Sequence, residues 1–462
     1  MISKLFTPSS NVHIFYHLLF NTLFSSVINF TVWFAVTFYI YIQTQSVFAT
    51  GMIAGIYLVA TMLTGIWFGG LVDHHRKKTM MIVSNLASLA LYAASLILYI
   101  VTPKEVFSDV SHPLLWVFVV MLLFGVIASN IRTITLPTLV TMLIPASRRD
   151  KANGLVGTVS GVSFLLTSVI SGLLVAAGGM LYVLWLALAI LIGSTLHLLF
   201  VTVPEKRVVH LEGVMKNIDL KGTFKIVVAV PGLLALILFS TFNNFLGGVF
   251  MALMDAYGLS LVSVQVWGIL WGALSTGFII GGLIIAKKGL GKNPVRSLLL
   301  TNGILWVICI LFPLHNSIIL LAIGMFIYML LVPYIEASEQ TILQRVVPFE
   351  RQGRVFGFAQ SVEQAASPLT AFLIGPLTQF FFIPLMTAGA GAQLIGSWFG
   401  TGQSRGIALV FIIAGVIGSV VTIMALWSKY YHQLSDVYLS TSGDDGDTPP
   451  SVDDAVKGGL IG

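Results

Sequence analysis

Long apolar segments of about 20 residues fill most of this 462-residue chain, and charged residues or Gly/Pro turns separate them. A helix of that length crosses the hydrocarbon core of a bilayer, and it satisfies its own backbone hydrogen bonds there. The pattern therefore predicts an all-α integral membrane protein. Twelve transmembrane helices are predicted, near residues 13–42, 47–71, 79–101, 113–143, 153–177, 179–203, 226–252, 262–286, 296–313, 317–341, 354–383 and 405–428.

The basic residues between the spans indicate how the chain is oriented. An even number of spans places both termini on one side of the membrane. If that side is the cytoplasm, 21 of the 24 Lys and Arg residues lie in cytoplasmic segments. Only Lys104 and Arg405 fall outside, and Arg132 lies within a span. Cytoplasmic loops carry an excess of Lys and Arg, so we predict that both termini are cytoplasmic.

Composition narrows the class of function. The chain is 57% hydrophobic and 9% charged, whereas soluble proteins carry about 25% charged residues. This deficit excludes a soluble enzyme, a disordered protein and a nucleic-acid binder. The single cysteine, Cys309, allows neither an intramolecular disulfide nor a cysteine metal cluster. The signatures of an ATP-binding loop, a zinc protease and a serine hydrolase are missing from the sequence, so we expect no enzyme activity, no cofactor and no metal.

The longest cytoplasmic connection divides the chain into halves. We expect an N-terminal six-helix bundle at 1–203, an inter-bundle loop at 204–225 and a C-terminal six-helix bundle at 226–430. The acidic cytoplasmic tail at 431–462 is predicted to be disordered, because it is rich in Asp, Gly, Pro and Ser. The Gly-rich external loop at about 384–404 is predicted to be re-entrant or to lie on the surface.

Two short patterns recur in both halves. Segments 145–154 and 348–357 each carry Pro, Arg and Gly at the same spacing, and each leads from the fourth to the fifth span of its half. Gly-x-x-x-Gly pairs at 65–69 and 277–281 precede basic turns, and small residues at this spacing let helices approach closely. The repeats indicate a duplicated six-helix unit. Such duplication is typical of secondary transporters, whose substrate site lies between the halves.

The turn after the second span carries a recognisable motif. It resembles the signature loop of the major facilitator superfamily, Gly-x-x-x-Asp-Arg-x-Gly-Arg-Arg/Lys. The matching residues are Gly69, Asp73, Lys77 and Lys78. His74 and Arg76 stand where the family has Arg and Gly. The later stretch 344–357 is similar to the corresponding loop of bacterial exporters that include macrolide-efflux and siderophore-export proteins.

The resemblance implies two pseudo-symmetric bundles that work by alternating access, in a monomer surrounded by lipids of a bacterial inner membrane. It also places Asp73 against the N-terminus of span eleven, where a helix stabilises a carboxylate. These contacts would lock the outward-open state. The candidates for this gate are Gly69, Asp73, Lys77, Lys78, Arg351, Gly353, Arg354 and Gly357.

Ionisable residues inside spans are costly and therefore suggest function. The candidates for proton coupling are Glu336, Glu339, Glu363 and Asp255. Glu336 and Glu339 are three residues apart and share one helix face. Since neighbouring and buried carboxylates resist full ionisation, one of them would exchange a proton near neutral pH.

Each of these residues also has a simpler interpretation. Glu339 could be cytoplasmic and pair with Arg345 or Arg351. Glu363 could accept a hydrogen bond between helices, and Asp255 could belong to a solvated turn. Arg132 could be the counter-charge of Glu363 or could contact an anion.

In the superfamily that the chain resembles, spans one, four, seven and ten line the cavity. The corresponding candidates, beside Glu336, are Asn21, Asn29, Trp33, Asn130, Arg132, Asn243, Asn244, Met251, Tyr328 and Tyr334.

The predicted function is a secondary active transporter. The resemblance favours the export of amphipathic small molecules, such as drugs, macrolides or siderophore-like compounds, in exchange for protons. The alternative within transport is a proton-coupled importer of a small polar solute or organic anion. Two other classes are a lipid-modifying membrane enzyme, which the missing catalytic motifs disfavour, and a scaffold that acts through the acidic tail.

Overall fold

The computed structural model describes residues 10–44, 47–205 and 220–440, which form helices and turns without any strand. The described part of the first half contains long helices and two short 3₁₀ turns. They are α1 (Ser10–Thr44), α2 (Val47–His74), α3 (Lys77–Val101), the 3₁₀ turn η2 (Lys104–Ser108), α4 (Pro113–Ala128), α5 (Asn130–Leu143), the 3₁₀ turn η3 (Ala146–Arg148) and α6 (Arg149–Phe200).

The second half of the chain contains further long helices and several short ones. Its elements are α7 (Leu220–Ala229), α8 (Leu233–Leu259), α9 (Val264–Lys288), α10 (Pro294–Leu311), α11 (Ile318–Val346), the 3₁₀ turn η4 (Phe349–Arg351), α12 (Gln352–Leu377), the π turn η5 (Thr378–Phe382), α13 (Ile383–Thr387), α14 (Ala390–Phe399), α15 (Gln403–Trp427) and α16 (Lys429–Ser440).

Eleven of the described helical stretches are long and apolar enough to cross a membrane, and one of them, α6, contains two of the expected spans. The backbone of α6 leaves the helical conformation at Gly178–Gly179, where Gly179 has a φ of +59°. Before this break Thr167 donates to the Val27 carbonyl at 3.1 Å. After it, the Ser194 carbonyl accepts from Asn21 at 2.8 Å. The chain therefore reverses along α1 at the two glycines, where the sequence predicts the turn between spans five and six.

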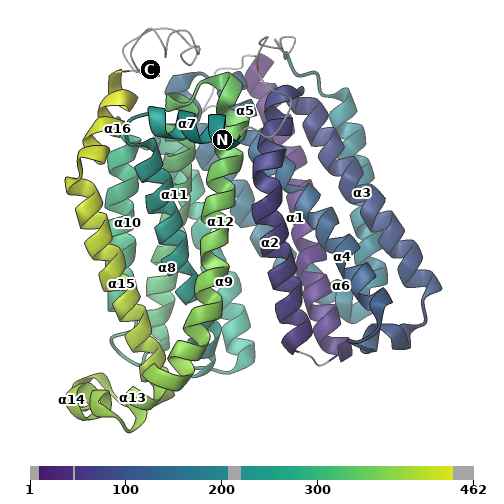
Figure 1. The fold of residues 1–462 in the computed structure, drawn as a ribbon. Coiled ribbons are helices and arrows are strands. Elements are labelled where there is room, and N and C mark those ends of the chain that lie inside the picture. Colours follow the sequence, from purple (N-terminus) through teal and green to yellow (C-terminus); the bar gives the residue numbers. More distant parts are fainter. Residues whose placement is uncertain (1–9, 45–46, 206–219, 441–462) are drawn as a thin grey trace.

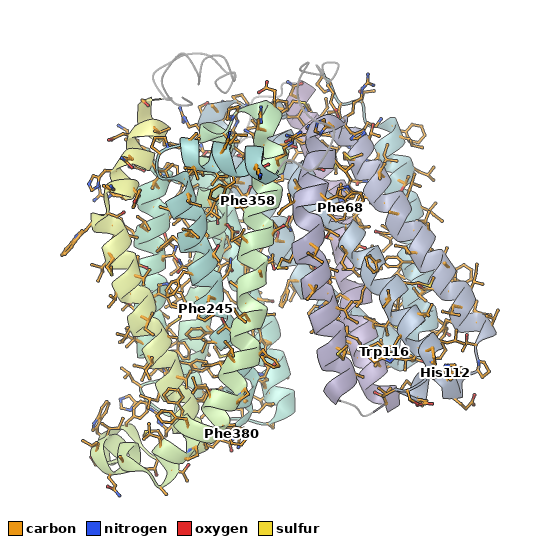
Figure 2. All side chains as sticks on the ribbon, in the orientation of Figure 1. Phe68, His112, Trp116, Phe245, Phe358 and Phe380 are labelled. Carbon is orange, nitrogen blue, oxygen red and sulfur yellow. The ribbon has the colours of Figure 1, made fainter. Side chains whose placement is uncertain are left out.

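The two halves form separate bundles that lie side by side (Figure 1). Between the bundles, α2 packs along α12 and α6 packs along α9. At one end of the molecule lie α7 and α16, and at the other end lie α13 and α14 (Figure 1). We call the end that holds α7, α16 and the α2–α3 turn the loop face. Because apolar side chains are directed outward all around the bundles (Figure 2), the outer surface suits lipid.

The predicted disordered tail is wrong over residues 431–440, which belong to α16. This helix is ordered by packing: Leu434 and Tyr438 are buried, Ser435 accepts from the Asn293 amide at 2.6 Å, and the Arg345 guanidinium lies 4.7 Å from the Tyr438 ring centroid. The rest of the predicted tail, 441–462, and the 206–219 part of the predicted inter-bundle loop lie outside the described residues.

Two other boundaries differ in detail. The seventh span was expected from residue 226, but residues up to Ala229 belong to α7 and the span begins at Leu233. Gly232 makes the turn between them with a φ of +79°, and it packs against the Tyr430 carbonyl of the α15–α16 region. The external loop expected at 384–404 contains α13 and α14, which lie beside the end of the bundle (Figure 1).

Candidate functional site

Asp73, near the end of α2, binds the N-terminus of α12. Its Oδ1 accepts a hydrogen bond from the Gly353 amide at 2.6 Å, and its Oδ2 accepts one from the Arg354 amide at 2.9 Å. The Arg354 guanidinium Nε lies 3.8 Å from Oδ2, and both side chains are buried. A carboxylate on the free amides of a helix N-terminus is a favourable arrangement. The contact joins the two bundles at the loop face, where the motif predicts it.

Glycines let the backbones of α2 and α12 touch. A Cβ atom on Gly69 would meet the Gly353 carbonyl, and a Cβ atom on Gly357 would meet the Gly65 carbonyl. A Cβ atom on Gly353 would meet the Asp73 carboxylate itself. Small residues are therefore needed on both helices for the carboxylate to reach the amides.

The basic residues of the loop form their hydrogen bonds with groups other than Asp73. The Lys77 ammonium is buried and donates to the Val72 carbonyl at 2.6 Å, while the exposed Lys78 ammonium donates to the Leu199 carbonyl at 3.2 Å. His74 replaces the Arg of the family motif, and its Nε2 lies 2.9 Å from Arg354 Nη2. Arg351 ends the η4 turn directly before α12.

Sequence reasoning missed Glu205, which follows α6. Its two carboxylate oxygens accept from the backbone amides of Lys77 and Lys78, both at 2.7 Å. The carboxylate thus caps the N-terminus of α3 directly after the signature loop. A single acidic residue at the end of span six was the only signal in the sequence, and its distance of 128 residues from Lys77 hid the pairing.

A second group of contacts closes the loop face between α6 and α11. The Asn153 amide donates to Thr341 Oγ1 and to Gln344 Oε1, both at 2.9 Å. Gln344 is fully buried and donates to the Pro137 carbonyl at 3.1 Å. Sequence reasoning missed both residues because Asn153 lies on span five, which was not expected to line the cavity, and Gln344 lies beyond the end of predicted span ten.

Behind these contacts lies a cavity of about 480 Å³ between the bundles. It is lined from both halves, by α1, α2, α4–α6, α8 and α10–α12. The predicted residues that line it are Asn29, Asn130, Arg132, Asn243, Asn244, Tyr328, Glu336, Glu339 and Glu363.

Five predicted residues do not line this cavity. Met251 is 80% exposed and faces away from the bundle. Trp33 stacks on Tyr57, with ring centroids 4.3 Å apart, and Tyr334 packs beside an apolar cluster of α9–α11. The other two, Asn21 and Asp255, are held by hydrogen bonds elsewhere. The structure therefore does not support the prediction that Asn21, Trp33, Met251 and Tyr334 line the cavity, or the prediction that Asp255 couples protons there. The reason is that the span on which a residue lies does not tell which way the helix turns that residue.

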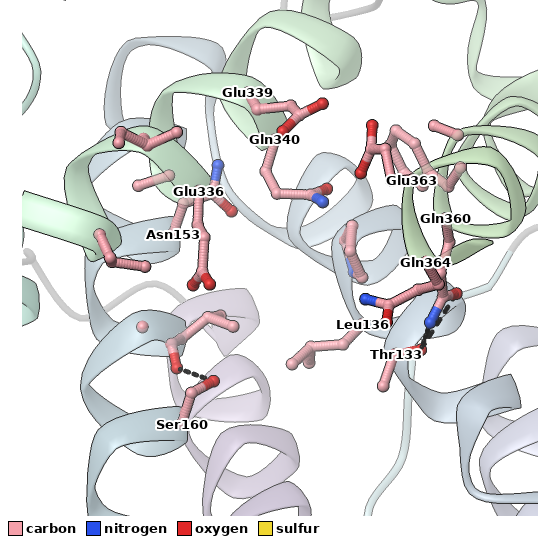
Figure 3. Close-up of a pocket in the computed structure, with 18 of the residues that line it drawn as sticks. Thr133, Leu136, Asn153, Ser160, Glu336, Glu339, Gln340, Gln360, Glu363 and Gln364 are labelled. Atoms are coloured by element: carbon pink, nitrogen blue, oxygen red, sulfur yellow. Dashed lines mark hydrogen bonds between the residues drawn. The ribbon is translucent and has the colours of Figure 1, made fainter. Parts of the chain in front are cut away.

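Three carboxylates enter the cavity from α11 and α12. Figure 3 shows Glu339 and Glu363 facing each other, while Glu336 points deeper into the cavity. Glu339 interacts with both Glu363 and Ser240, and Glu336 lies close enough to feel the charge of Glu339. One oxygen of Glu339 and one of Glu363 are buried without a hydrogen-bond partner. The cavity wall is therefore acidic.

These carboxylates have no basic partner among the residues that the structure describes, where Asp73–Arg354 is the only salt bridge. The alternative that Glu339 pairs with Arg345 or Arg351 is wrong, because Glu339 is directed inward while Arg345 stacks on Tyr438. Burying a carboxylate without a cation is costly, so the group is a candidate site rather than a structural ion pair.

Arg132 belongs to the opposite wall. It is 2% exposed, and its Nη1 donates to Asn21 Oδ1 at 2.9 Å and to Thr22 Oγ1 at 3.3 Å. Its Nη2 donates to Asn85 Oδ1 at 2.7 Å. Since all three acceptors are neutral, Arg132 is not the counter-charge of Glu363. Asn85, on α3, was missed because span three was not expected near the cavity.

Asp255 lies near the end of α8 that is remote from the loop face. Its Oδ1 accepts from the indole nitrogens of Trp267 at 2.9 Å and Trp271 at 3.1 Å. The side chain is exposed, but it is more than a solvated turn, because it ties α8 to α9.

Two helical bundles with a cavity between them, closed at one face by contacts between helix ends, form the arrangement that is typical of secondary transporters. A model of the Major Facilitator Superfamily matches residues 18–371 of the chain. The chain belongs to this superfamily: it is a multi-pass membrane transporter and not an enzyme.

Two curated relatives of the chain are macrolide efflux proteins. Macrolide efflux protein A of Streptococcus pyogenes is 24% identical over 359 residues, which cover 73% of this chain and 83% of the relative. Macrolide efflux protein A of Enterococcus faecalis is 24% identical over 315 residues, covering 65% of this chain and 92% of the relative.

Solved structures share the fold at low identity. A bacterial homologue of the iron transporter ferroportin, in an outward-facing state, superposes with a TM-score of 0.67 at 15% identity, covering 89% of this chain and 98% of that one. The human organic anion transporter MFSD10 superposes with a TM-score of 0.67 at 14% identity, covering 89% of this chain and 100% of that one. The proton:xylose symporter XylE superposes with a TM-score of 0.64 at 14% identity, covering 93% of this chain and 100% of that one.

Proposed function

We propose that this transporter exports amphipathic small molecules of the macrolide type in exchange for protons. The observation that carries the proposal is a group of three carboxylates in a cavity between the two bundles, Glu336, Glu339 and Glu363, none of which pairs with a basic residue of the described chain. The efflux function of the curated relatives supports the direction of transport.

The carboxylates provide the exchange chemistry. Glu339 and Glu363 face each other from α11 and α12, and two buried carboxylates in contact cannot both stay charged without a neutralising cation. A proton can supply that charge, and so can a substrate with a protonated amine. Because both compete for the same oxygens, binding one releases the other, which is the requirement for antiport.

The cavity suits a small organic molecule. Its volume of about 480 Å³ lies within the range of known small-molecule pockets. Its lining combines the carboxylates with amides and with aromatic groups such as Tyr328 and Trp306. Trp306 is oriented by a hydrogen bond to Asn243 at 2.7 Å. An aromatic wall beside an acidic one favours ligands that are apolar and basic.

The closed loop face fits an outward-open state of an alternating-access cycle. The hydrogen bonds of Asp73, Asn153 and Gln344 all join the bundles at this face. Because the loop face carries most of the basic residues, we assign it to the cytoplasm of a bacterial inner membrane. Export then requires these contacts to break, so that the cavity opens inward to load substrate.

The test is the accumulation of a radiolabelled macrolide in cells that express the chain, with and without a protonophore. We expect low accumulation that rises when the proton gradient collapses. Glu363→Gln should abolish the exclusion, because an amide neither binds a cation nor exchanges a proton. Asp255→Asn is the matched control, since this carboxylate lies outside the cavity lining. Protonophore-insensitive exclusion would reject proton coupling, and accumulation above that of cells without the chain would favour the importer.

A further inference from the structure

The short helix α7 presents one mixed basic and apolar face to its surroundings. Lys221, Phe224, Lys225 and Val228 are all exposed, and their spacing of three, four and seven residues puts them on one side of the helix. Phe224 and Val228 are 48% and 51% exposed. We call these four residues the α7 stripe.

The other side of α7 is fixed to the protein. Thr223, Ile226 and Val227 are buried, and the helix contacts α8 and α12. Figure 1 shows α7 lying across the loop face rather than along the spans. The transmembrane helices end at this level, so the stripe is placed where the headgroups of the adjacent leaflet lie.

We propose that the α7 stripe binds anionic phospholipid of the leaflet at the loop face. Lysine ammonium groups would contact the lipid phosphates, and Phe224 and Val228 would enter the boundary between headgroups and acyl chains. Charge complementarity favours this occupant, because neither lysine forms a salt bridge with a carboxylate in the described part of the chain. The inference goes beyond the proposed export function and does not depend on it.

A direct contact connects the stripe to the closed gate. The Phe224 ring meets the Phe358 ring edge-on, with centroids 6.4 Å apart, and Figure 2 shows Phe358 near the loop-face end of α12. The preceding residue, Gly357, packs against Gly65 of the other bundle. Lipid that holds α7 in place therefore supports the position of α12 against α2, and so favours the closed loop face.

The first test measures lipid binding by the purified full chain in detergent, titrated with phosphatidylglycerol or with phosphatidylcholine. We expect a preference for phosphatidylglycerol. The double variant Lys221→Gln/Lys225→Gln should weaken that binding about 25-fold, because each lysine near an anionic surface contributes about five-fold. The matched control is Lys287→Gln/Lys288→Gln, which removes two exposed lysines from the loop-face end of α9. No lipid preference, or an equal loss in both double variants, would overturn the site.

The second test measures the coupling to the gate. Spin labels on Val59→Cys and Leu373→Cys, in a Cys309→Ser background, report the separation of α2 and α12 at exposed positions away from the loop face. We expect phosphatidylglycerol to raise the population with the longer distance. Phe358→Ala should retain lipid binding within two-fold but lose this shift, because it breaks the ring contact without altering the stripe. A shift that persists in Phe358→Ala would reject the coupling, and neither readout requires transport activity.

Discussion

At the scale of single residues, the gate depends on one carboxylate, both of whose oxygens accept hydrogen bonds from the other bundle. Asp73 receives two backbone hydrogen bonds from α12 and the charge of Arg354. Hydrogen bonds to a charged group contribute about 1.5–3 kcal/mol each. Asp73 is therefore one of the places where hydrogen bonds hold the loop face closed, together with the Asn153–Gln344 group.

We predict that Asp73→Asn leaves the protein folded but lowers the transport rate at least ten-fold. The amide has only one oxygen and turns donor hydrogens toward the Gly353 or Arg354 amide, so the closed state loses stability. The measurement is the initial rate of substrate efflux, with size-exclusion chromatography to confirm folding. Asp109→Asn is the control, because Asp109 is an exposed loop carboxylate that bonds only Ser111. Near-normal efflux in the Asp73 variant would rule out the gate.

The three cavity carboxylates show which contacts could be predicted from the sequence and which could not. The spacing of Glu336 and Glu339 on one helix indicated an interacting pair, and the structure does place them close together. The stronger partner of Glu339 is Glu363 on the next helix. Which side chains meet across helices depends on the rotation and tilt of each helix, and a hydrophobic span without a polar stripe does not specify its rotation.

At the scale of helices, close packing of α2 on α12 makes the glycines at the contact sensitive to substitution and leaves others tolerant. We predict that Gly357→Ala separates the helices and lowers both thermal stability and transport, because its Cβ would meet the Gly65 carbonyl. Gly375→Ala on the same helix should have little effect, since no atom lies within 4 Å of its added Cβ. Thermal unfolding of the purified proteins compares the two variants. Equal midpoints would show that the contact between α2 and α12 is not tight.

The capping of α3 by Glu205 gives another prediction for a helix. Glu205→Ala removes the acceptors of the Lys77 and Lys78 amides and should destabilise the protein by about 1 kcal/mol, the usual contribution of a helix cap. Chemical or thermal unfolding measures the loss. Glu105→Ala, an exposed acidic residue of η2, serves as the comparison and should be neutral. If both variants unfold alike, the cap contributes nothing.

At the scale of the whole molecule, the all-helical membrane fold could be predicted because long apolar spans depend on local composition. Length and apolarity identify a span, and the paired turns before α6 and α12 are the pattern from which the repeat is predicted. The ordered part of the tail could not be predicted in this way. The sequence of α16 is polar on average, and its helix forms because Leu434 and Tyr438 are buried against the C-terminal bundle.

The packing of α16 leads to a prediction that also separates a transporter from a scaffold. Removing residues 441–462 should leave efflux and stability unchanged, because the described contacts of the C-terminal segment end with α16. Removing residues 429–462 should lower stability, because it deletes the Tyr438 ring beneath Arg345 and the Ser435 hydroxyl that accepts from Asn293. Efflux and thermal unfolding of the two truncations give the comparison. A scaffold that acts through its acidic tail would lose function when only residues 441–462 are removed, while its stability stayed intact. A transporter should lose stability and function together, and only when α16 is also removed.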